Sequence, residues 1–100
     1  MLDIQKTKEG ENLLISVSGR LDTTTSPELE TIIKEEMADT SSLTIDMENL
    51  EYISSAGLRV LLLAQKAMNE KDGKMVVKKP NDVSREIFEM TGFMDFLTVE

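Results

Sequence analysis

The clearest alternation of apolar and polar residues lies at residues 13–18, where Leu13, Ile15 and Val17 share one face of a predicted strand. Residues 1–8 alternate more weakly, as an edge strand does. The turn signal between these two stretches predicts an antiparallel hairpin. Further strands are predicted at residues 43–47, short and central in the sheet, at residues 75–78, and at residues 97–99.

Two stretches carry apolar residues at the spacing of amphipathic helices. The first begins at Ser26-Pro27-Glu28, which supplies a cap, a proline at the first helical position and an acid in the first turn. The second runs from Ser55 to Glu70 and ends at the turn at residues 71–74. The buried stripes are predicted to be Leu29, Ile32, Ile33 and Met37 in the first helix, and Leu58, Leu61, Leu62 and Met68 in the second.

A third helix is predicted after Asn81 or Asp82, either of which can cap it, and Gly92 is its C-terminal stop. One more helical turn is predicted at residues 93–96. The residues expected to face the core are Val83, Ile87 and Met90, with Phe88 at their margin.

The order of these elements is β-β-α-β-α-β-α-(α)-β. A strand–helix–strand step implies parallel neighbours with right-handed crossovers, whereas the opening hairpin is antiparallel. We therefore predict an α/β fold, in which a mixed sheet carries helices mainly on one face. One hundred residues suit a single domain, residues 1–100, with a core of limited size.

Composition and charge exclude several classes of function. The net charge of −8 argues against binding a nucleic-acid backbone and favours a protein partner with a basic face. The absence of cysteine and histidine excludes zinc sites built on them and Ser-His-Asp or Cys-His catalysis in this chain alone. The longest apolar run, residues 60–64, is too short to span a bilayer, and residues 1–6 lack the apolar core of a signal peptide. We expect a cytoplasmic protein with no membrane insertion and no cofactor.

The stretch richest in functional chemistry is Ile53-Ser54-Ser55-Ala56-Gly57-Leu58, where the second helix begins. A serine at a helix entrance usually caps it, and two adjacent serines supply one hydroxyl more than capping needs. The free N–H groups and the dipole of a helix N-terminus favour anions. Gly57 is expected to let another molecule approach the backbone closely. These features favour an exposed hydroxyl that accepts a phosphate; the alternative is that Ser55 is simply the cap.

This stretch resembles the central motif of the STAS domain family, named for sulphate transporters and anti-sigma factor antagonists. Gly19-Arg20-Leu21-Asp22 is similar to the family's Gly-x-Leu-Asp turn, and residues 83–93 are similar to its last helix and glycine stop. In the bacterial antagonists the phosphorylated serine lies two residues before the motif glycine, which makes it Ser55 here. The family usually has aspartate before that serine and serine or threonine after it, where this chain has Ser54 and Ala56.

The resemblance implies a regulatory binding protein rather than an enzyme. The unphosphorylated antagonist binds an anti-sigma factor serine kinase and releases sigma factor. The kinase, using ATP and magnesium, then phosphorylates Ser55, with Ser54 as the alternative acceptor, and ends the complex. The partner-binding residues are expected to be Asp22, Ser54, Ser55, Ala56, Gly57, Leu58 and Arg59.

The role of Arg59 stays open from the sequence, whereas the surroundings of the phosphate can be predicted. Arg59 stands where the family has a small residue, and it can pair with a Ser55 phosphate, pair with a partner carboxylate or point to solvent. The phosphate is expected to lie near Asp22, Asp46, Glu48 and Glu51, and to act by repulsion and desolvation at an interface with little change of fold.

Two other classes of function compete with the first. In one, the chain is a STAS docking subunit of a transporter or signalling assembly and works without phosphorylation. The other, a small enzyme, is poorly supported because no catalytic constellation replaces the missing histidine and cysteine. The sequence leaves a monomer and a weak dimer equally open.

Overall fold

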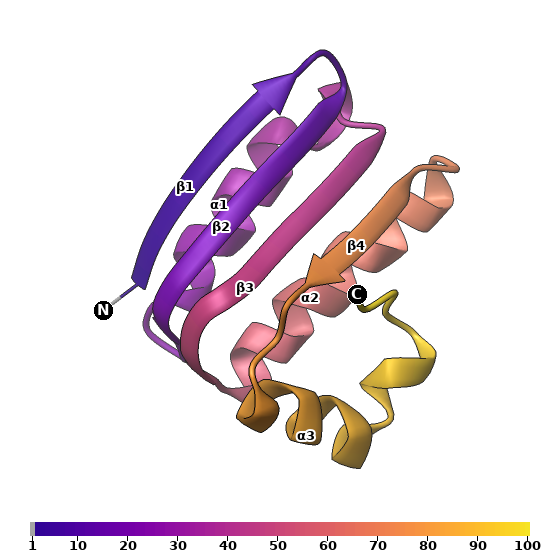
Figure 1. The fold of residues 1–100 in the computed structure, drawn as a ribbon. Coiled ribbons are helices and arrows are strands. Elements are labelled where there is room, and N and C mark those ends of the chain that lie inside the picture. The colour runs from indigo at the N-terminus through magenta and orange to yellow at the C-terminus, as the bar shows by residue number, and fades with distance from the viewer. Residues whose placement is uncertain (1) are drawn as a thin grey trace.

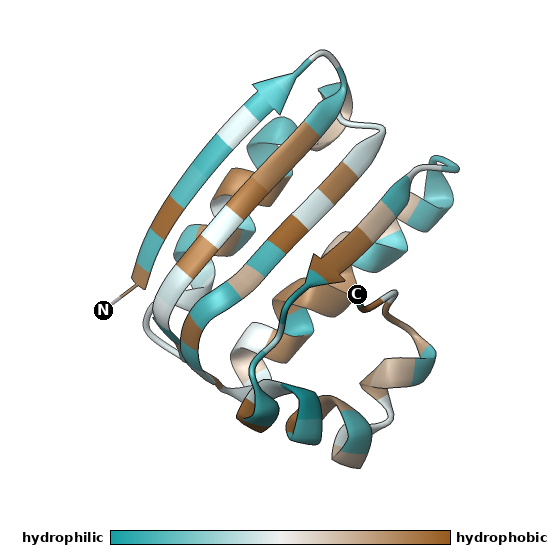
Figure 2. Ribbon diagram, in the orientation of Figure 1, coloured by the Kyte–Doolittle hydropathy of each residue, from teal (hydrophilic) through white to brown (hydrophobic). Residues whose placement is uncertain are grey.

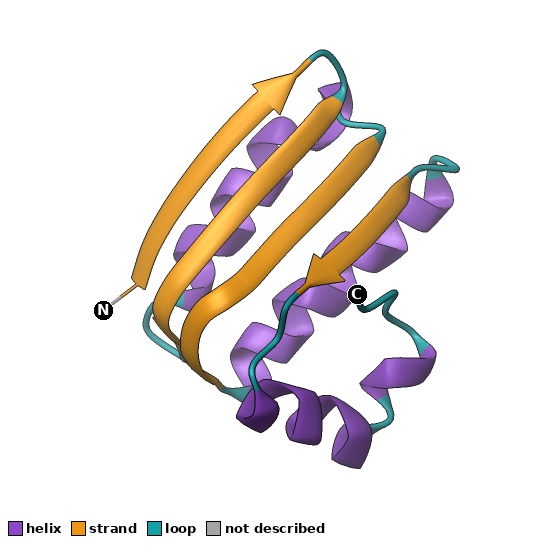
Figure 3. Ribbon diagram, viewed as in Figure 1, coloured by secondary structure: helices purple, strands orange, loops and turns teal. Residues whose placement is uncertain are grey.

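The computed structural model describes residues 2–100, which form a four-stranded mixed sheet with helices α1 and α2 behind one face (Figures 1 and 3). The strands lie in the order β1-β2-β3-β4; β1 runs antiparallel to β2, while β2, β3 and β4 are parallel. The predicted α/β class, hairpin, edge strand and central strand are confirmed. The elements are β1 (Leu2–Glu9), β2 (Asn12–Leu21), α1 (Ser26–Glu36), η1 (Met37–Asp39), β3 (Ser42–Ile53), α2 (Ser55–Glu70), β4 (Lys74–Lys78), α3 (Asp82–Thr91) and η2 (Phe93–Asp95).

The core lies between the sheet and the helices. Leu13, Ile15 and Val17 of β2 are buried, as their alternation predicts. Figure 2 shows the corresponding change between apolar and polar segments along β2 and β3. On the helix side, Leu29 and Ile33 of α1 are buried, as are residues along α2. Among residues 2–100, no helix is both long and apolar enough to cross a membrane.

The strands β2 and β3 are longer than predicted. Residues 48–53, which lie beyond the strand predicted at residues 43–47, continue β3, and Leu50 and Ile53 pair with Gly19 and Leu21 at the end of β2. Two register shifts in this pairing break the simple alternation, which is why the sequence pattern resembles a loop. As a result, both strands end next to the first turn of α2.

The start of α1 differs from the prediction by one residue. Thr25, not Ser26, occupies the cap position, and its side chain makes no capping bond to the helix. The Thr25 hydroxyl instead donates a hydrogen bond of 2.7 Å to the carbonyl oxygen of Arg20. This bond ties the helix entrance to the end of β2.

Helix α3 presents a different face to the core from the one predicted. Phe88, expected at the margin, is fully buried, whereas Val83 and Met90, expected to face inward, are 52% and 80% exposed. Ile87 is half-buried and packs against the core. The prediction was wrong because the inward position one turn before Phe88 is the polar residue Ser84, which interrupts the apolar stripe.

Asn81 fastens α3 to the end of the sheet. Its side-chain oxygen accepts a hydrogen bond from the backbone N–H of Ser84 at 2.8 Å, which makes it the cap that the sequence left open between Asn81 and Asp82. Its side-chain amide donates to the carbonyl oxygen of Leu50 at 2.6 Å. Gly92, with φ of 80°, ends the helix as predicted, and η2 is the predicted extra turn.

The strand predicted at residues 97–99 is reduced to one parallel bridge between Val99 and Val77. The backbone N–H of Val77 donates to the carbonyl oxygen of Thr98 at 2.8 Å, and that of Glu100 donates to the carbonyl oxygen of Val77 at 2.9 Å. A full strand does not form here because the N–H of Leu97 still bonds to the carbonyl oxygen of Phe93, at 2.9 Å, so the helical turn extends to this residue.

Candidate functional site

Ser54 and Ser55 have separate roles at the start of α2. Ser54 is the cap: its backbone is extended, and its hydroxyl oxygen accepts a hydrogen bond of 3.4 Å from the N–H of Gly57. Its own N–H donates to the carbonyl oxygen of Leu21 at 2.9 Å, which joins the helix entrance to the end of β2. Ser55 is the first helical residue, is exposed, and takes no part in the cap. The question that the sequence left open is therefore answered: Ser54 caps the helix, and Ser55 is exposed and free of the cap.

This division of roles predicts different effects for two alanine variants. Ser54→Ala removes the cap, and we expect it to lower the free energy of unfolding by about 1 kcal/mol. Ser55→Ala removes an exposed hydroxyl, and we expect a change within about 0.5 kcal/mol. Urea denaturation of both variants beside the wild type checks this. A larger loss in Ser55→Ala than in Ser54→Ala would reverse the two roles.

Asp22 lies directly after β2 and organises the loop beside the two serines. One oxygen of its carboxylate accepts hydrogen bonds from the backbone N–H groups of Thr24 and Thr25, at 3.0 and 3.1 Å, and from the Thr24 hydroxyl, at 2.8 Å. These bonds favour the ionised form, with the Thr24 hydroxyl contributing most, and lower the pKa of Asp22 to about 2. Because the N–H of Ser54 bonds to Leu21, this fixed negative charge lies at the same end of the sheet as Ser55.

The lowered pKa of Asp22 makes part of the stability depend on pH. The unfolded chain binds this proton more readily than the folded chain, so the contribution is complete above about pH 4 and is lost as the pH falls toward 2. We expect the difference in unfolding free energy between wild type and Asp22→Asn to narrow over this range. Denaturant melts at a series of pH values measure it. A difference that stays constant down to pH 2 would contradict the assignment.

Arg20 and Tyr52 form a neighbouring feature that the sequence did not reveal. The Arg20 guanidinium lies over the Tyr52 ring, 4.4 Å from its centroid, and 4.0 Å from the Asp22 carboxylate. The two residues are paired across β2 and β3, a register that appears only when both strands are extended past the predicted ends. Tyr52 is exposed, so this contact lies on the surface.

Arg59 lies one helical turn after Ser55 and is exposed. One of its terminal guanidinium nitrogens donates a hydrogen bond of 3.3 Å to the Glu30 carboxylate of α1. Lys34 also pairs with Glu30, at 2.9 Å. The Lys34 hydrogen bond is the largest cause of the lowered pKa of Glu30, and Arg59 adds to it. The partner of Arg59 in this structure is therefore a carboxylate of its own chain.

Gly57 and Leu58 are interior residues. The prediction that Gly57 lets another molecule approach the backbone is therefore wrong. A methyl group at Gly57 would lie 2.8 Å from Ile53 and from Leu21, both buried, so the space beside this glycine is filled by the protein's own core. Leu58 is 6% exposed. These two residues let α2 pack closely on the sheet, and the solvent-facing part of the stretch consists of Ser55 and Arg59, with Ser54 and Ala56 half-buried.

The acidic cluster predicted around Ser55 is smaller than expected. Asp46 lies within β3, eight residues before Ser54, a separation of about 26 Å along an extended strand. Glu48 pairs with Lys79, with 3.1 Å between the carboxylate oxygen and the amine nitrogen. The prediction placed these acids together because it ended the strand at residue 47, whereas β3 continues to Ile53. Glu51 lies near the end of β3, three positions before Ser54, and Asp22 lies at the same end of the sheet because Leu21 bonds to Ser54.

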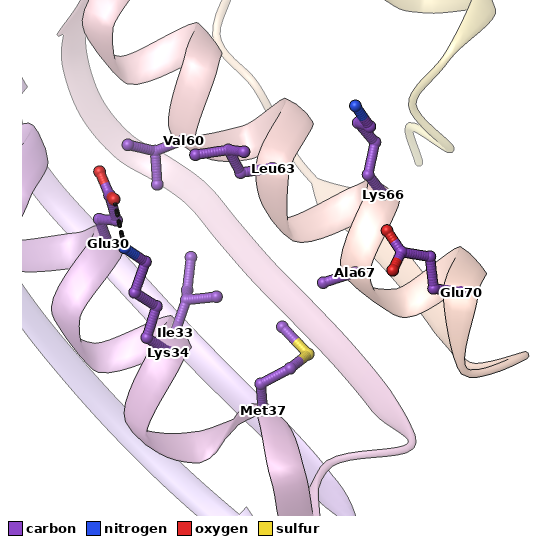
Figure 4. Close-up of a pocket in the computed structure, with 9 residues that line it drawn as sticks. All are labelled: Glu30, Ile33, Lys34, Met37, Val60, Leu63, Lys66, Ala67 and Glu70. Carbon is purple, nitrogen blue, oxygen red and sulfur yellow. Dashed lines mark ion pairs between the residues drawn. The ribbon is translucent and has the colours of Figure 1, made fainter.

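A groove of about 400 Å³ runs between α1 and α2 (Figure 4). Its floor is apolar, formed by Ile33 and Met37 on α1 and by Val60, Leu63 and Ala67 on α2. Glu30 and Lys34 stand on one rim, Lys66 and Glu70 on the other, and Figure 4 shows the ion pair between the first two.

Comparison with known proteins agrees with this geometry. The family model described as STAS domain matches residues 3–100, so the chain belongs to the STAS domain family. The anti-sigma-B factor antagonist of Staphylococcus aureus is 31% identical over 99 residues, which cover 98% of this chain and 92% of that protein.

Solved structures of the anti-sigma factor antagonist SpoIIAA share the fold at 17% identity. The unphosphorylated form has a TM-score of 0.87 and covers 98% of this chain and 88% of that one. The phosphorylated form, described as a Bacillus cell fate determinant, has a TM-score of 0.81 and covers 98% and 91%. The resemblance seen in the sequence is confirmed.

Proposed function

We propose that this chain is an anti-sigma factor antagonist. Unphosphorylated, it binds an anti-sigma factor that is also a serine kinase, and phosphorylation of Ser55 ends the complex. The observation that carries the proposal is the exposed Ser55 hydroxyl, left free because Ser54 caps the helix. Support comes from the Staphylococcus aureus relative, named an anti-sigma-B factor antagonist, which aligns over nearly the whole chain.

In this proposal the chain is a substrate of the kinase and not itself an enzyme. The Ser55 oxygen attacks the γ-phosphorus of ATP bound with magnesium on the kinase, and ADP leaves. The serine O–H bond breaks, and in this proposal its proton passes to a base of the kinase, as in phosphoryl transfer to a substrate hydroxyl. The product is a phosphoserine at the first position of α2.

The phosphate acts through charge at the interface. It adds about −1.5 to −2 charges to a surface that already holds the ionised Asp22. The free N–H groups of the first turn of α2 tolerate this charge in the isolated protein, so the fold is kept. A docked partner surface must instead desolvate it, which opposes binding.

The partner-facing side chains in this proposal are those of Asp22, Ser54, Ser55, Ala56 and Arg59. Gly57 and Leu58 support them from inside, because both are buried. The net charge of −8 matches a basic surface on the partner. A role with a kinase and sigma factor implies the cytoplasm as the working compartment.

Intact-mass spectrometry after incubation with the cognate anti-sigma kinase and ATP tests the proposal. We expect one added phosphate on the wild type and on Ser54→Ala, and none on Ser55→Ala. Phosphate on Ser55→Ala but not on Ser54→Ala would make Ser54 the acceptor. No phosphate on the wild type, with a kinase active on another substrate, would favour a docking subunit that works without phosphorylation.

A further inference from the structure

We propose that Arg59 is the internal counter-ion of the Ser55 phosphate, and that phosphorylation moves its guanidinium from Glu30 to the phosphate. This inference rests on the proposed phosphorylation of Ser55. It assigns a regulated ion-pair exchange to Arg59, Glu30 and Lys34.

The positions of Ser55 and Arg59 permit direct contact. Both residues lie in α2, four positions apart and exposed. Side chains at this spacing are neighbours on one helix face, with about 5–6 Å between their Cβ atoms. The anion stands N-terminal to the cation, which is the more favourable order for such a pair.

The present bond of Arg59 is easily exchanged. It is one hydrogen bond of 3.3 Å, and the Arg59 side chain is 63% exposed. Solvent weakens an ion pair of this kind. Glu30 does not lose its charge compensation when Arg59 leaves, because Lys34 remains 2.9 Å away.

A phosphate is the stronger partner for the guanidinium. It carries up to two negative charges and three acceptor oxygens, against one charge already shared on Glu30. A guanidinium can donate two parallel hydrogen bonds to a phosphate. The exchange therefore replaces one long bond with a shorter, charge-assisted pair.

Two other charged groups at this end of the molecule, Arg20 and Asp22, are already engaged. Arg20 stacks on Tyr52 and lies 4.0 Å from Asp22, and the Asp22 carboxylate is held by the Thr24 and Thr25 donors. The carboxylates of Asp22 and Glu30 both repel the phosphate. Arg59, a cation on α2 itself, is placed to offset this repulsion. Arg20 is the competing candidate that the experiment must separate from Arg59.

The exchange has a consequence beyond Ser55. The Arg59–Glu30 pair links α2 to α1, and Glu30 stands on the rim of the groove between these helices (Figure 4). When Arg59 turns to the phosphate, this link opens while the Glu30–Lys34 pair on α1 stays. Phosphorylation thus changes the surface at the groove rim as well as at the serine.

The test is a ³¹P NMR pH titration of protein that carries phosphoserine at position 55, introduced during translation so that no kinase is needed. A nearby cation favours the dianion and lowers the second pKa of the phosphate. We expect Arg59→Gln to raise that pKa by roughly 0.3 to 1 relative to the wild type. Lys66→Gln, which removes the same charge from the same helix farther from Ser55, is the matched control, and we expect it to leave the pKa unchanged.

Two further NMR measurements distinguish the exchange of Arg59 between Glu30 and the phosphate from a change in overall charge alone. In the wild type, the Nε–H resonance of Arg59 is expected to move together with the phosphate titration. Glu30→Gln is expected to lower the phosphate pKa further, because it removes both the competitor for Arg59 and a negative charge.

An equal phosphate pKa in Arg59→Gln and Lys66→Gln would overturn the inference. So would a rise seen in Arg20→Gln instead of Arg59→Gln. If the kinase fails to phosphorylate the wild type, the proposed function falls, but this titration still reports on Arg59 because the phosphate is already in place.

Discussion

Phe88→Ala is expected to lower the free energy of unfolding by about 3–5 kcal/mol. Phe88 is the largest of the fully buried side chains, and it joins α3 to the core of the sheet. Its removal loses apolar burial and leaves a cavity that the surrounding residues fill only in part. Urea denaturation followed by circular dichroism measures the loss.

Met90→Ala is the matched control on the same helix. Met90 is 80% exposed, so its truncation is expected to change the free energy of unfolding by no more than about 0.5 kcal/mol. Phe88→Leu supplies a milder core variant if Phe88→Ala does not fold. An equal or larger loss in Met90→Ala would mean that α3 turns its other face to the core.

Gly57→Ala is expected to destabilise the protein by about 1–3 kcal/mol, although alanine favours helices over glycine. The added methyl would lie 2.8 Å from Cγ1 of Ile53 and from Cγ of Leu21. Neither atom is the free end of a side chain, and both residues are buried, so the start of α2 must move away from the sheet. Denaturation in urea measures the loss.

Leu21→Ala in combination with Gly57→Ala tests the cause of that loss. Leu21→Ala removes the Cγ atom that the new methyl meets, so the double variant is expected to lose less stability than the sum of the two single variants. A strictly additive pair, or a stabilising Gly57→Ala, would show that the glycine is not required by packing.

Strong local patterns made much of the fold predictable. The bounds of α2 match the prediction because a serine cap and a turn at residues 71–74 mark its two ends. The extended ends of β2 and β3 were missed because their register shifts interrupt the alternation. The inward face of α3 was missed because it includes the polar Ser84, while Val83 and Met90 mimic an apolar stripe on the solvent side.

The site was predictable in part for the same reason. The adjacent serines are visible in the sequence, but only the backbone shows that Ser54 is the cap. Arg59 was singled out, yet its partner Glu30 lies on another helix, 29 positions earlier, and no local pattern connects the two. The Arg20–Tyr52 contact likewise depends on the pairing of two strands.

Isothermal titration calorimetry with the cognate anti-sigma factor tests the proposed switch at Ser55 most directly. The wild type, unphosphorylated, is titrated beside the same chain with phosphoserine at position 55, and beside Ser55→Ala. We expect binding by the wild type and Ser55→Ala and at least about a 100-fold weaker affinity for the phosphorylated form, because a docked partner surface would have to desolvate the phosphate. Equal affinity of the phosphorylated and unphosphorylated chains would contradict a switch at Ser55.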